Sequence, residues 1–195
     1  AAINIIRAGH KCPTLIISHS DTGVESPVVR ALADGELQKI AAAAPGASVY
    51  CRVLTDGNGA EWPLSRKFGC STRMAAVLLL KARDLGLDAC GVSFHVGSQQ
   101  SDLRQWDATV GGAAKLFKRL REDGLDLRLL NLGGGFPIRY RRDVPDTERC
   151  ANAVMGAVTK HFGNALPDMI VEPGRALVGN AGEIESEVVL VSRKD

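Results

Sequence analysis

One segment of the chain combines a histidine, a glycine and a serine in a pattern that suits an active site. Residues 94–99 read FHVGSQ, so His95 follows an apolar run and Ser98 comes shortly after it. If the run is a buried strand, the imidazole and the hydroxyl lie at its carboxyl end, which in barrel enzymes carries the chemistry. The structural alternative is a histidine that only forms a hydrogen bond within a loop.

A second segment contains three consecutive glycines. Residues 131–137 read NLGGGFP, and Gly133, Gly134 and Gly135 directly follow another apolar run. Because glycine has no side chain, the backbone here can approach a ligand closely and direct several N–H groups at one anion. The alternative is a flexible turn, but glycines are entropically costly to order, which favours a functional loop. The spacing differs from the GxGxxG pattern of dinucleotide-binding proteins.

A third segment brings a carboxylate and a guanidinium together. Residues 171–175 read VEPGR, with Glu172 and Arg175 on either side of a Pro-Gly turn. A carboxylate at the end of an apolar strand needs a cationic partner. Either Arg175 is that partner, or Arg175 binds a phosphate while Glu172 faces a protonated ring nitrogen. In the second case the three segments would hold a phosphate, an aromatic ring and a ring nitrogen, which together describe pyridoxal 5'-phosphate (PLP).

The elements that must position these segments alternate between short apolar runs and amphipathic stretches. The runs suit strands buried on both faces of a parallel sheet, and they span residues 49–54, 91–96, 127–132 and 169–171. Helices are predicted from Ser71 to Gly86, over 107–122, and from near Asp146 to Gly163. The strand ends recur at intervals of about 40 residues, which favours a (β/α)8 barrel over a doubly wound sheet.

The two ends of the chain fit this pattern less well. Residues 1–34 show only a weak apolar run at 15–17, and an Asp-Gly pair at 34–35 interrupts the first helical stretch, so that a clean helix is expected only over 36–44. Residues 184–191 alternate and then become apolar, which predicts a strand leaving the barrel. The expected division is a divergent or truncated segment (1–34), a partial barrel (35–183) and the start of a strand toward a missing β-domain (184–195).

Composition excludes several classes of protein. The chain has 195 residues, is 45% hydrophobic and carries a formal net charge of +2, with basic residues too dispersed for nucleic-acid binding. The apolar runs are too short to span a membrane, and the first ten residues lack a signal-peptide pattern. The five cysteines are spread out without a CxxC pair, which argues against a disulfide framework or a metal site and favours the cytoplasm.

The three segments, in this order and spacing, resemble the fold-type III PLP-dependent decarboxylases, which include ornithine, lysine, arginine and diaminopimelate decarboxylases. VYCRVLTD at 49–56 and SRKFG at 65–69 are also similar to that family, and the resemblance covers residues 35–194. FHVGS together with GGGFP is more similar to the ornithine/lysine branch. The resemblance implies an alanine-racemase-like cofactor barrel, represented here by its C-terminal half. It also implies that the complete protein is a homodimer that decarboxylates ornithine or lysine to a diamine in polyamine biosynthesis.

The resemblance also implies roles for individual residues. His95 would stack on the pyridine ring and Glu172 would keep its nitrogen protonated, so these two are the expected catalytic residues. Arg52 would lie near the cofactor, and Lys67 near the dimer interface. The expected phosphate ligands are Ser98, Gly133, Gly134, Gly135, Gly174 and Arg175.

Two departures from the family pattern limit what the chain is expected to do alone. The family's cofactor lysine lies on the first barrel strand in a motif like YAVKAN, which is missing here, and Lys11 stands in a different context. The C-terminal β-domain is also missing, so we expect the 195-residue chain by itself to be inactive. The alternatives are a diaminopimelate decarboxylase-type enzyme and a non-catalytic homologue that acts by protein binding, as antizyme inhibitors do. A plain phosphate-binding barrel is disfavoured by the negative charge of Glu172.

Overall fold

The computed structural model describes residues 3–5, 14–17, 27–63 and 68–193. Lys11, Lys67 and the stretch 18–26 lie outside the described residues. The described strands are β1 (Ile3–Ile5), β2 (Thr14–Ile17), β3 (Ser48–Arg52), β4 (Ala60–Trp62), β5 (Asp88–Ser93), β6 (Ser98–Gln100), β7 (Leu129–Asn131) and β8 (Asp168–Ile170). The described helices are α1 (Pro27–Ala43), α2 (Thr72–Asp84), α3 (Arg104–Glu122), α4 (Thr147–Phe162) and α5 (Gly174–Val178).

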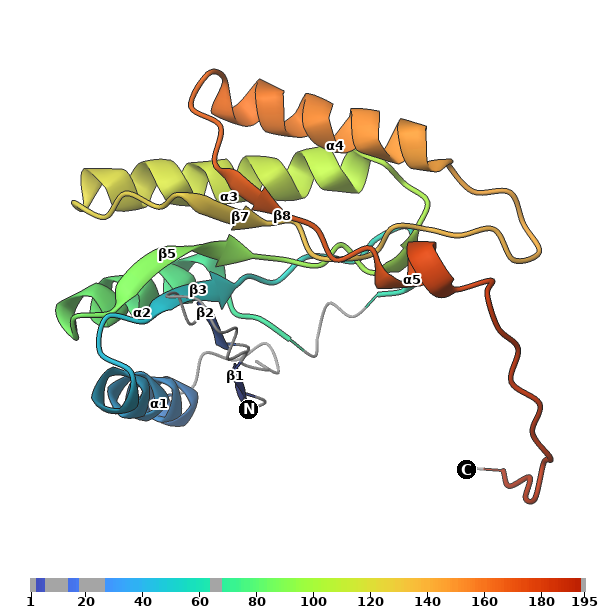
Figure 1. The fold of residues 1–195 in the computed structure, drawn as a ribbon, viewed down its shortest axis with the longest axis horizontal. Helices are drawn as coiled ribbons and strands as arrows, with labels where there is room; N and C mark the ends of the chain where they lie inside the picture. Colours follow the sequence, from blue (N-terminus) through green and yellow to red (C-terminus); the bar gives the residue numbers. More distant parts are fainter. Residues whose placement is uncertain (1–2, 6–13, 18–26, 64–67, 194–195) are drawn as a thin grey trace.

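Six strands form one sheet in the order β1-β2-β3-β5-β7-β8. Neighbours from β2 to β8 are parallel, whereas β1 is antiparallel to β2. A helix connects each parallel strand to the next, and Figure 1 shows these helices accompanying the strands from α1 at the lower edge to α4 at the top. The predicted parallel α/β architecture is confirmed. β4 and β6 form a separate antiparallel ribbon.

The strand register places equivalent residues in rows across the sheet. In the last row Arg52 lies opposite Ser93, Ser93 opposite Asn131, and Asn131 opposite Ile170. Side chains alternate between the two faces of a sheet, so these four share the face that the helices do not cover. The residues between them pack on the helix side in one continuous core, which includes Val49, Cys51, Val92, Phe94, Leu130 and Leu132.

The predicted helix ends agree closely with the observed caps. The Ser71 side chain accepts a hydrogen bond from the Met74 N–H at the start of α2, and the Asp146 side chain accepts one from the Arg149 N–H at the start of α4. Each satisfies a backbone donor that the first helical turn leaves without a partner. The α3 helix begins a few residues earlier than predicted, at Arg104.

The predicted interruption at residues 34–35 is wrong, because α1 runs without a break from Pro27 to Ala43. A glycine inside a helix costs about 1 kcal/mol relative to alanine. Ala33, Leu37 and Ile40 offset that cost, since all three are buried in the core. The weak apolar run at 15–17 belongs to β2, which pairs with β3.

Over residues 184–191, where a strand leading into a further domain is predicted, the structure shows no regular element. A strand requires a neighbouring backbone to bond with, and the described part of the chain offers none here, since Val189 is 90% exposed. Among the described residues, no helix combines the length and the apolar character that crossing a bilayer would need.

Candidate cofactor site

The positions just beyond the last row of the sheet bring the three predicted segments together. His95, Gly133 and Glu172 each follow that row by two residues and therefore lie on the same face. The Glu172 N–H donates to the Gly133 carbonyl at 2.8 Å. A Cβ atom added to Gly134 would lie 3.1 Å from His95 Nε2. The histidine, the glycine loop and the carboxylate thus meet at the carboxyl ends of β5, β7 and β8.

The environment of His95 keeps its imidazole neutral. Nδ1 accepts a hydrogen bond from the Gly97 N–H at 3.0 Å, which requires an unprotonated nitrogen there. Burial lowers the pKa of His95 and the nearby positive charge of Arg52 lowers it further, while Glu172 acts in the opposite direction. The His95 carbonyl accepts from the Thr55 hydroxyl at 2.6 Å, which fixes the backbone at this point. A neutral, held ring is suited to stack on a flat ligand.

The three glycines permit an approach between loops that no other residue would allow. A Cβ atom at Gly133 would overlap the Phe94 carbonyl oxygen, and one at Gly135 would lie 2.5 Å from the Gly97 carbonyl oxygen. Gly133 and Gly135 also have positive φ angles of 64° and 105°. The loop is therefore packed backbone to backbone against residues 94–97, and the flexible-turn alternative does not describe it.

Glu172 is held by a side chain that the motif analysis did not assign to the site. Asn131 Nδ2 donates to Glu172 Oε1 at 2.8 Å and also to the Tyr50 hydroxyl at 3.3 Å. Asn131 Oδ1 accepts from the Gly133 N–H at 2.9 Å. One buried amide therefore orients the carboxylate and anchors the start of the glycine loop.

Arg52 supplies the positive charge in this part of the sheet. Its guanidinium lies over the Phe68 ring at 5.2 Å, and burial lowers its pKa while the Coulomb attraction of Glu172 raises it. The Arg52 Nε atom is buried without a hydrogen-bond partner among the described residues. Within the described part of the chain, this donor is therefore free for a ligand.

Arg175 does not pair with Glu172. Its guanidinium lies over the Trp62 ring at 5.5 Å and donates to the Tyr140 hydroxyl at 3.2 Å. The Trp62 backbone pairs with that of Ser98 in the β4–β6 ribbon, so both predicted phosphate ligands neighbour the same residue. Gly174 begins α5 with open space around its Cα. The ion-pair reading of the VEPGR segment is therefore wrong, and Arg175 is available to an anion.

Sequence reasoning missed two site residues, Asn131 and Tyr50. Both stand in the motifs, and both lie on the uncovered face, Asn131 at the end of β7 and Tyr50 two residues before the end of β3, where the period of two predicts them once the register is known. Burial raises the pKa of Tyr50, with Glu172 adding to the effect, while the hydrogen bond from Asn131 opposes it. A polar residue inside an otherwise apolar strand is the pattern that could have identified them.

These residues fit PLP. The glycine loop has no side chains in the way of its backbone N–H groups, although the Gly133 N–H already donates to Asn131, and Arg175 is an exposed cation. Arg52 has an unused donor, and Glu172 is a carboxylate fixed beside a neutral histidine. Phosphate, flat ring and protonated ring nitrogen each have a chemically matched group in this set.

Comparison with known proteins decides the family. Residues 17–179 match the model of the pyridoxal-dependent decarboxylase, pyridoxal binding domain. The chain belongs to this family. Its cofactor is accordingly PLP, and the sheet described above is part of the cofactor barrel of a fold-type III decarboxylase. The family match begins at residue 17, within β2, whereas the resemblance drawn from the motifs begins at residue 35.

The relatives include decarboxylases and an antizyme inhibitor, and the decarboxylases compared below are considerably longer than this chain. The lysine/ornithine decarboxylase of Selenomonas ruminantium is 37% identical over 159 residues, which are 79% of this chain and 39% of that protein. Mouse ornithine decarboxylase is 35% identical over 159 residues, 79% of this chain and 33% of that protein. A crystal structure of an SrLDC mutant in complex with PLP superposes with a TM-score of 0.68 at 34% identity, over 74% of this chain and 37% of that one. The chain therefore spans less than half of the relatives it matches.

Proposed function

We propose that the protein carrying this chain uses PLP to decarboxylate a basic amino acid, ornithine or lysine, to the corresponding diamine. The observation that carries the proposal is the placement of Glu172. Its carboxylate lies just beyond the strand ends, next to the glycine loop and His95, and accepts a 2.8 Å hydrogen bond from Asn131 Nδ2. A carboxylate adds unwanted charge to a site that binds only an anion, but it suits one that also receives a protonated ring. The similarity to lysine/ornithine decarboxylase favours a basic amino acid as substrate.

In this proposal each residue has a distinct task. When bound, the cofactor supplies an electron sink for the electron pair left as carbon dioxide departs. Glu172 keeps the ring nitrogen protonated, because an adjacent negative charge favours the charged form. His95 lies against the ring as a neutral imidazole. Arg175, Ser98, Gly174 and the glycine-loop N–H groups hold the phosphate, and Arg52 lies close to Glu172.

The division of tasks between Arg175 and Glu172 can be tested by two substitutions in the full-length protein. Arg175→Ala should weaken PLP binding by about 1.5–3 kcal/mol, the range for hydrogen bonds to charged groups. Glu172→Gln should mainly lower kcat, because the amide cannot hold the ring nitrogen protonated. The measurements are the dissociation constant from reconstitution of the cofactor-free protein, and kcat with ornithine and lysine. An equal loss of cofactor affinity in both variants would contradict the proposed roles.

We further propose that the 195-residue chain alone is inactive, that its residues 184–195 lead toward a second domain, and that the complete protein is a cytoplasmic homodimer. Cys51, Cys70 and Cys150 are free thiols, which is the state expected in a reducing compartment. The test of inactivity is to mix the chain with PLP, reduce with borohydride, and search for a labelled lysine by mass spectrometry. Stoichiometric labelling together with carbon dioxide release from ornithine or lysine would overturn this expectation.

A further inference from the structure

Gln99 has a backbone conformation that glutamine rarely adopts. Its φ is 55°, and it is the non-glycine residue with positive φ among those that the structure describes. An L-residue held in this region costs about 1–3 kcal/mol, and such strain persists only where the surroundings impose it. Gln99 directly follows the predicted phosphate ligand Ser98 and is only 3% exposed.

The Gln99 side chain forms two hydrogen bonds to the backbone of one residue that is distant in sequence. Its Nε2 donates to the Ile138 carbonyl at 2.8 Å, and its Oε1 accepts from the Ile138 N–H at 2.8 Å. The carboxamide thereby satisfies both backbone groups of Ile138, as a neighbouring strand would. Ile138 lies just after the glycine loop, so the contact ties β6 to the end of that loop.

The remainder of the loop is already fixed by other groups. Its first N–H, that of Gly133, donates to Asn131 Oδ1 at 2.9 Å, and the Gly135 carbonyl accepts from the Gln100 N–H at 2.9 Å. The Gly133 carbonyl also accepts from the Glu172 N–H at 2.8 Å, so the Gln99 contact is the last of the attachments spaced along residues 133–138. Without it, the loop would be held at its start and middle but not at its end.

We propose that Gln99 is a positioning residue for the phosphate group of the cofactor. It fixes the spacing between Ser98 and the glycine loop, so that their donors face one anion before it binds. This inference rests on the proposed function, because it assumes that these donors receive the phosphate of PLP. Preorganised donors bind more tightly because the loop loses no further freedom on binding.

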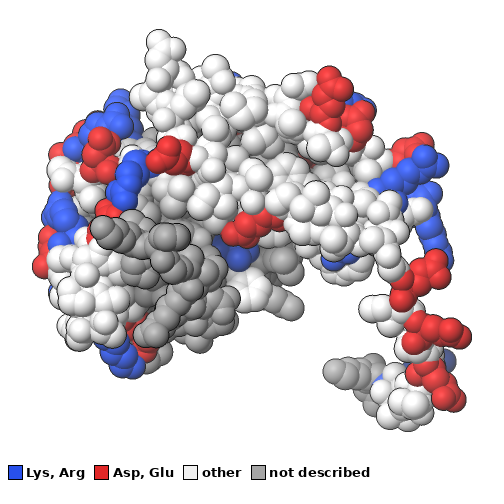
Figure 2. Space-filling model, in the orientation of Figure 1, with Lys and Arg blue, Asp and Glu red and all other residues white. Residues whose placement is uncertain are grey.

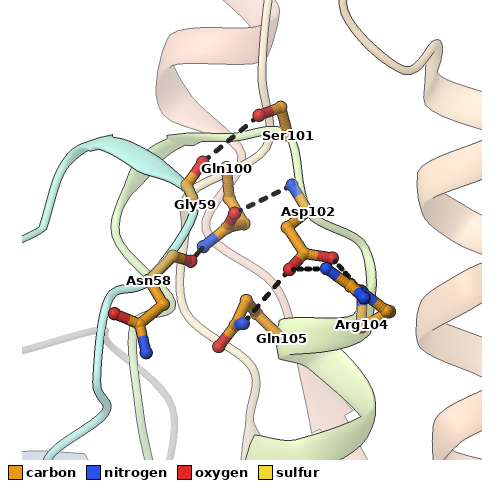
Figure 3. Close-up of polar contacts among 7 residues, drawn as sticks. All are labelled: Asn58, Gly59, Gln100, Ser101, Asp102, Arg104 and Gln105. Atoms are coloured by element: carbon orange, nitrogen blue, oxygen red, sulfur yellow. Dashed lines mark hydrogen bonds and ion pairs between the residues drawn. The ribbon is translucent and has the colours of Figure 1, made fainter.

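The adjacent residue provides a matched control. Gln100 is fully buried, and its side chain donates to the carbonyls of Asn58 (2.8 Å) and Val96 (2.9 Å) and accepts from the Asp102 N–H (3.0 Å). Figure 3 shows this side chain directed at the Asn58–Gly59 turn and the start of α3. The Gln100 side chain makes at least as many hydrogen bonds as the Gln99 side chain, but none of the Gln100 side-chain bonds goes to the glycine loop.

The test compares Gln99→Met and Gln99→Gly with Gln100→Met in the full-length protein. Methionine is close to glutamine in shape and removes the hydrogen bonds, while glycine also removes the backbone strain. Both Gln99 variants should bind PLP about tenfold more weakly, the effect of losing one or two neutral hydrogen bonds. Pyridoxal, which lacks the phosphate, should bind with unchanged affinity. Gln100→Met should lower thermal stability. Its PLP affinity should stay within about twofold of the wild type, which is well below the roughly tenfold loss expected for the Gln99 variants.

A second readout needs no cofactor. Hydrogen exchange at the Ile138 amide should accelerate in both Gln99 variants of the cofactor-free protein, and should be unchanged in Gln100→Met. Gln99→Glu adds a conservative rescue: a protonated carboxyl both donates and accepts, so its PLP affinity relative to the wild type should recover as the pH falls toward 5. Inorganic phosphate, used as a competitor of PLP, should follow the same order of affinities as PLP itself.

The outcomes separate the two proposals. If the wild-type protein does not bind PLP, the proposed function fails. If it binds PLP and both Gln99 variants bind equally well, or if pyridoxal binding falls in parallel with PLP binding, only the role of Gln99 is overturned. If Gln99→Met does not fold, Gln99→Gly carries the test alone, because glycine adopts positive φ without strain.

Discussion

Asn131 uses every polar atom of its side chain at the site. It donates to Glu172 and Tyr50 and accepts from the Gly133 N–H, and it is 2% exposed. Two of these contacts set the orientation of groups that the proposed reaction needs. The residue therefore couples the position of the carboxylate to that of the glycine loop, although it touches neither the ring nor the phosphate in the proposed scheme.

Two substitutions at Asn131 should separate these contacts. Asn131→Asp keeps an acceptor for the Gly133 N–H but replaces the donor to Glu172 with a second negative charge. Asn131→Leu removes both and leaves the Gly133 N–H unsatisfied, a loss of about 1–3 kcal/mol. We expect both variants to lower kcat and the melting temperature, and the melting temperature of Asn131→Asp to recover in part as the pH falls, because its new carboxylate is buried beside Glu172. Asn58→Asp, an exposed change of the same type, should alter neither.

The protonation of His95 should depend on its neighbour Arg52. Burial and the Arg52 charge both hold the pKa of His95 below its usual value, so the native state takes up its proton only at lower pH than the unfolded chain does. This group therefore makes the fold less stable as the pH falls through the ordinary histidine range of about 6.5. Arg52→Gln should raise the pKa of His95, since it removes a like charge.

The measurement is the pH dependence of hydrogen exchange at the His95 Cε1 position, read peptide by peptide with mass spectrometry. Arg121→Gln, at the far end of α3, serves as the control of equal charge change. An unaltered His95 midpoint in Arg52→Gln would show that burial alone depresses its pKa.

At the scale of elements, the start of α4 depends on a single side chain. Asp146 Oδ1 accepts from the Arg149 N–H at 2.8 Å. Asp146→Ala should destabilise the protein by about 1 kcal/mol, the usual value for a lost N-cap. Asp143→Ala, the same change three residues earlier, removes only an exposed contact to Arg139 at 3.4 Å and should cost almost nothing. Thermal melting of the two variants checks the difference, and equal melting points would contradict the capping role.

The elements that could be predicted from the sequence are those whose local pattern agrees with their packing. Ser71 and Asp146 mark helix starts, and the apolar runs mark the parallel strands, because capping and burial act on neighbouring residues. The α1 helix was missed in part because its stability comes from distant contacts of Leu37 and Ile40, which outweigh a local glycine. The strand at 184–191 was predicted from its own residues, but pairing needs a partner strand that local sequence cannot reveal.

The same contrast applies to the site. His95, the three glycines, Glu172 and Arg175 stand in contiguous motifs, so their meeting at one sheet edge followed from the order of strands. The contacts of Asn131 and Gln99 could not be predicted in this way. The Gln99–Ile138 and Asn131–Glu172 contacts join residues 39 and 41 positions apart, and both depend on the exact register and loop packing.

For the molecule as a whole, the sheet ends at β8, whose only described neighbour is β7. An apolar groove of about 430 Å³ runs between α4 and this edge, lined in part by Val154, Met169 and Leu177. Leu177 is 72% exposed. Figure 2 shows a largely uncharged surface over α4, β8 and α5. An edge strand with free backbone groups next to exposed apolar side chains favours association with another chain.

We therefore expect the 195-residue chain alone to self-associate in a concentration-dependent manner. Met169→Glu combined with Leu177→Glu should reduce this, because burying the new carboxylates is costly. Asn152→Glu combined with Thr159→Glu adds the same charge on the exposed side of α4 and should have little effect. Sedimentation velocity at several concentrations measures the difference. A monomer at every concentration would show that the open edge does not drive association.

The alignment of Arg52, Ser93, Asn131 and Ile170 in one row also limits how such a protein can diverge by insertion and deletion. Loss of one residue inside β5 would turn the His95 side of the strand toward the helices and the Phe94 side toward the site. Loops at the amino ends of the strands carry no such constraint. Lineages descended from this chain should therefore accumulate length changes at the amino ends of the strands, while the spacing from each strand to its site residue stays constant.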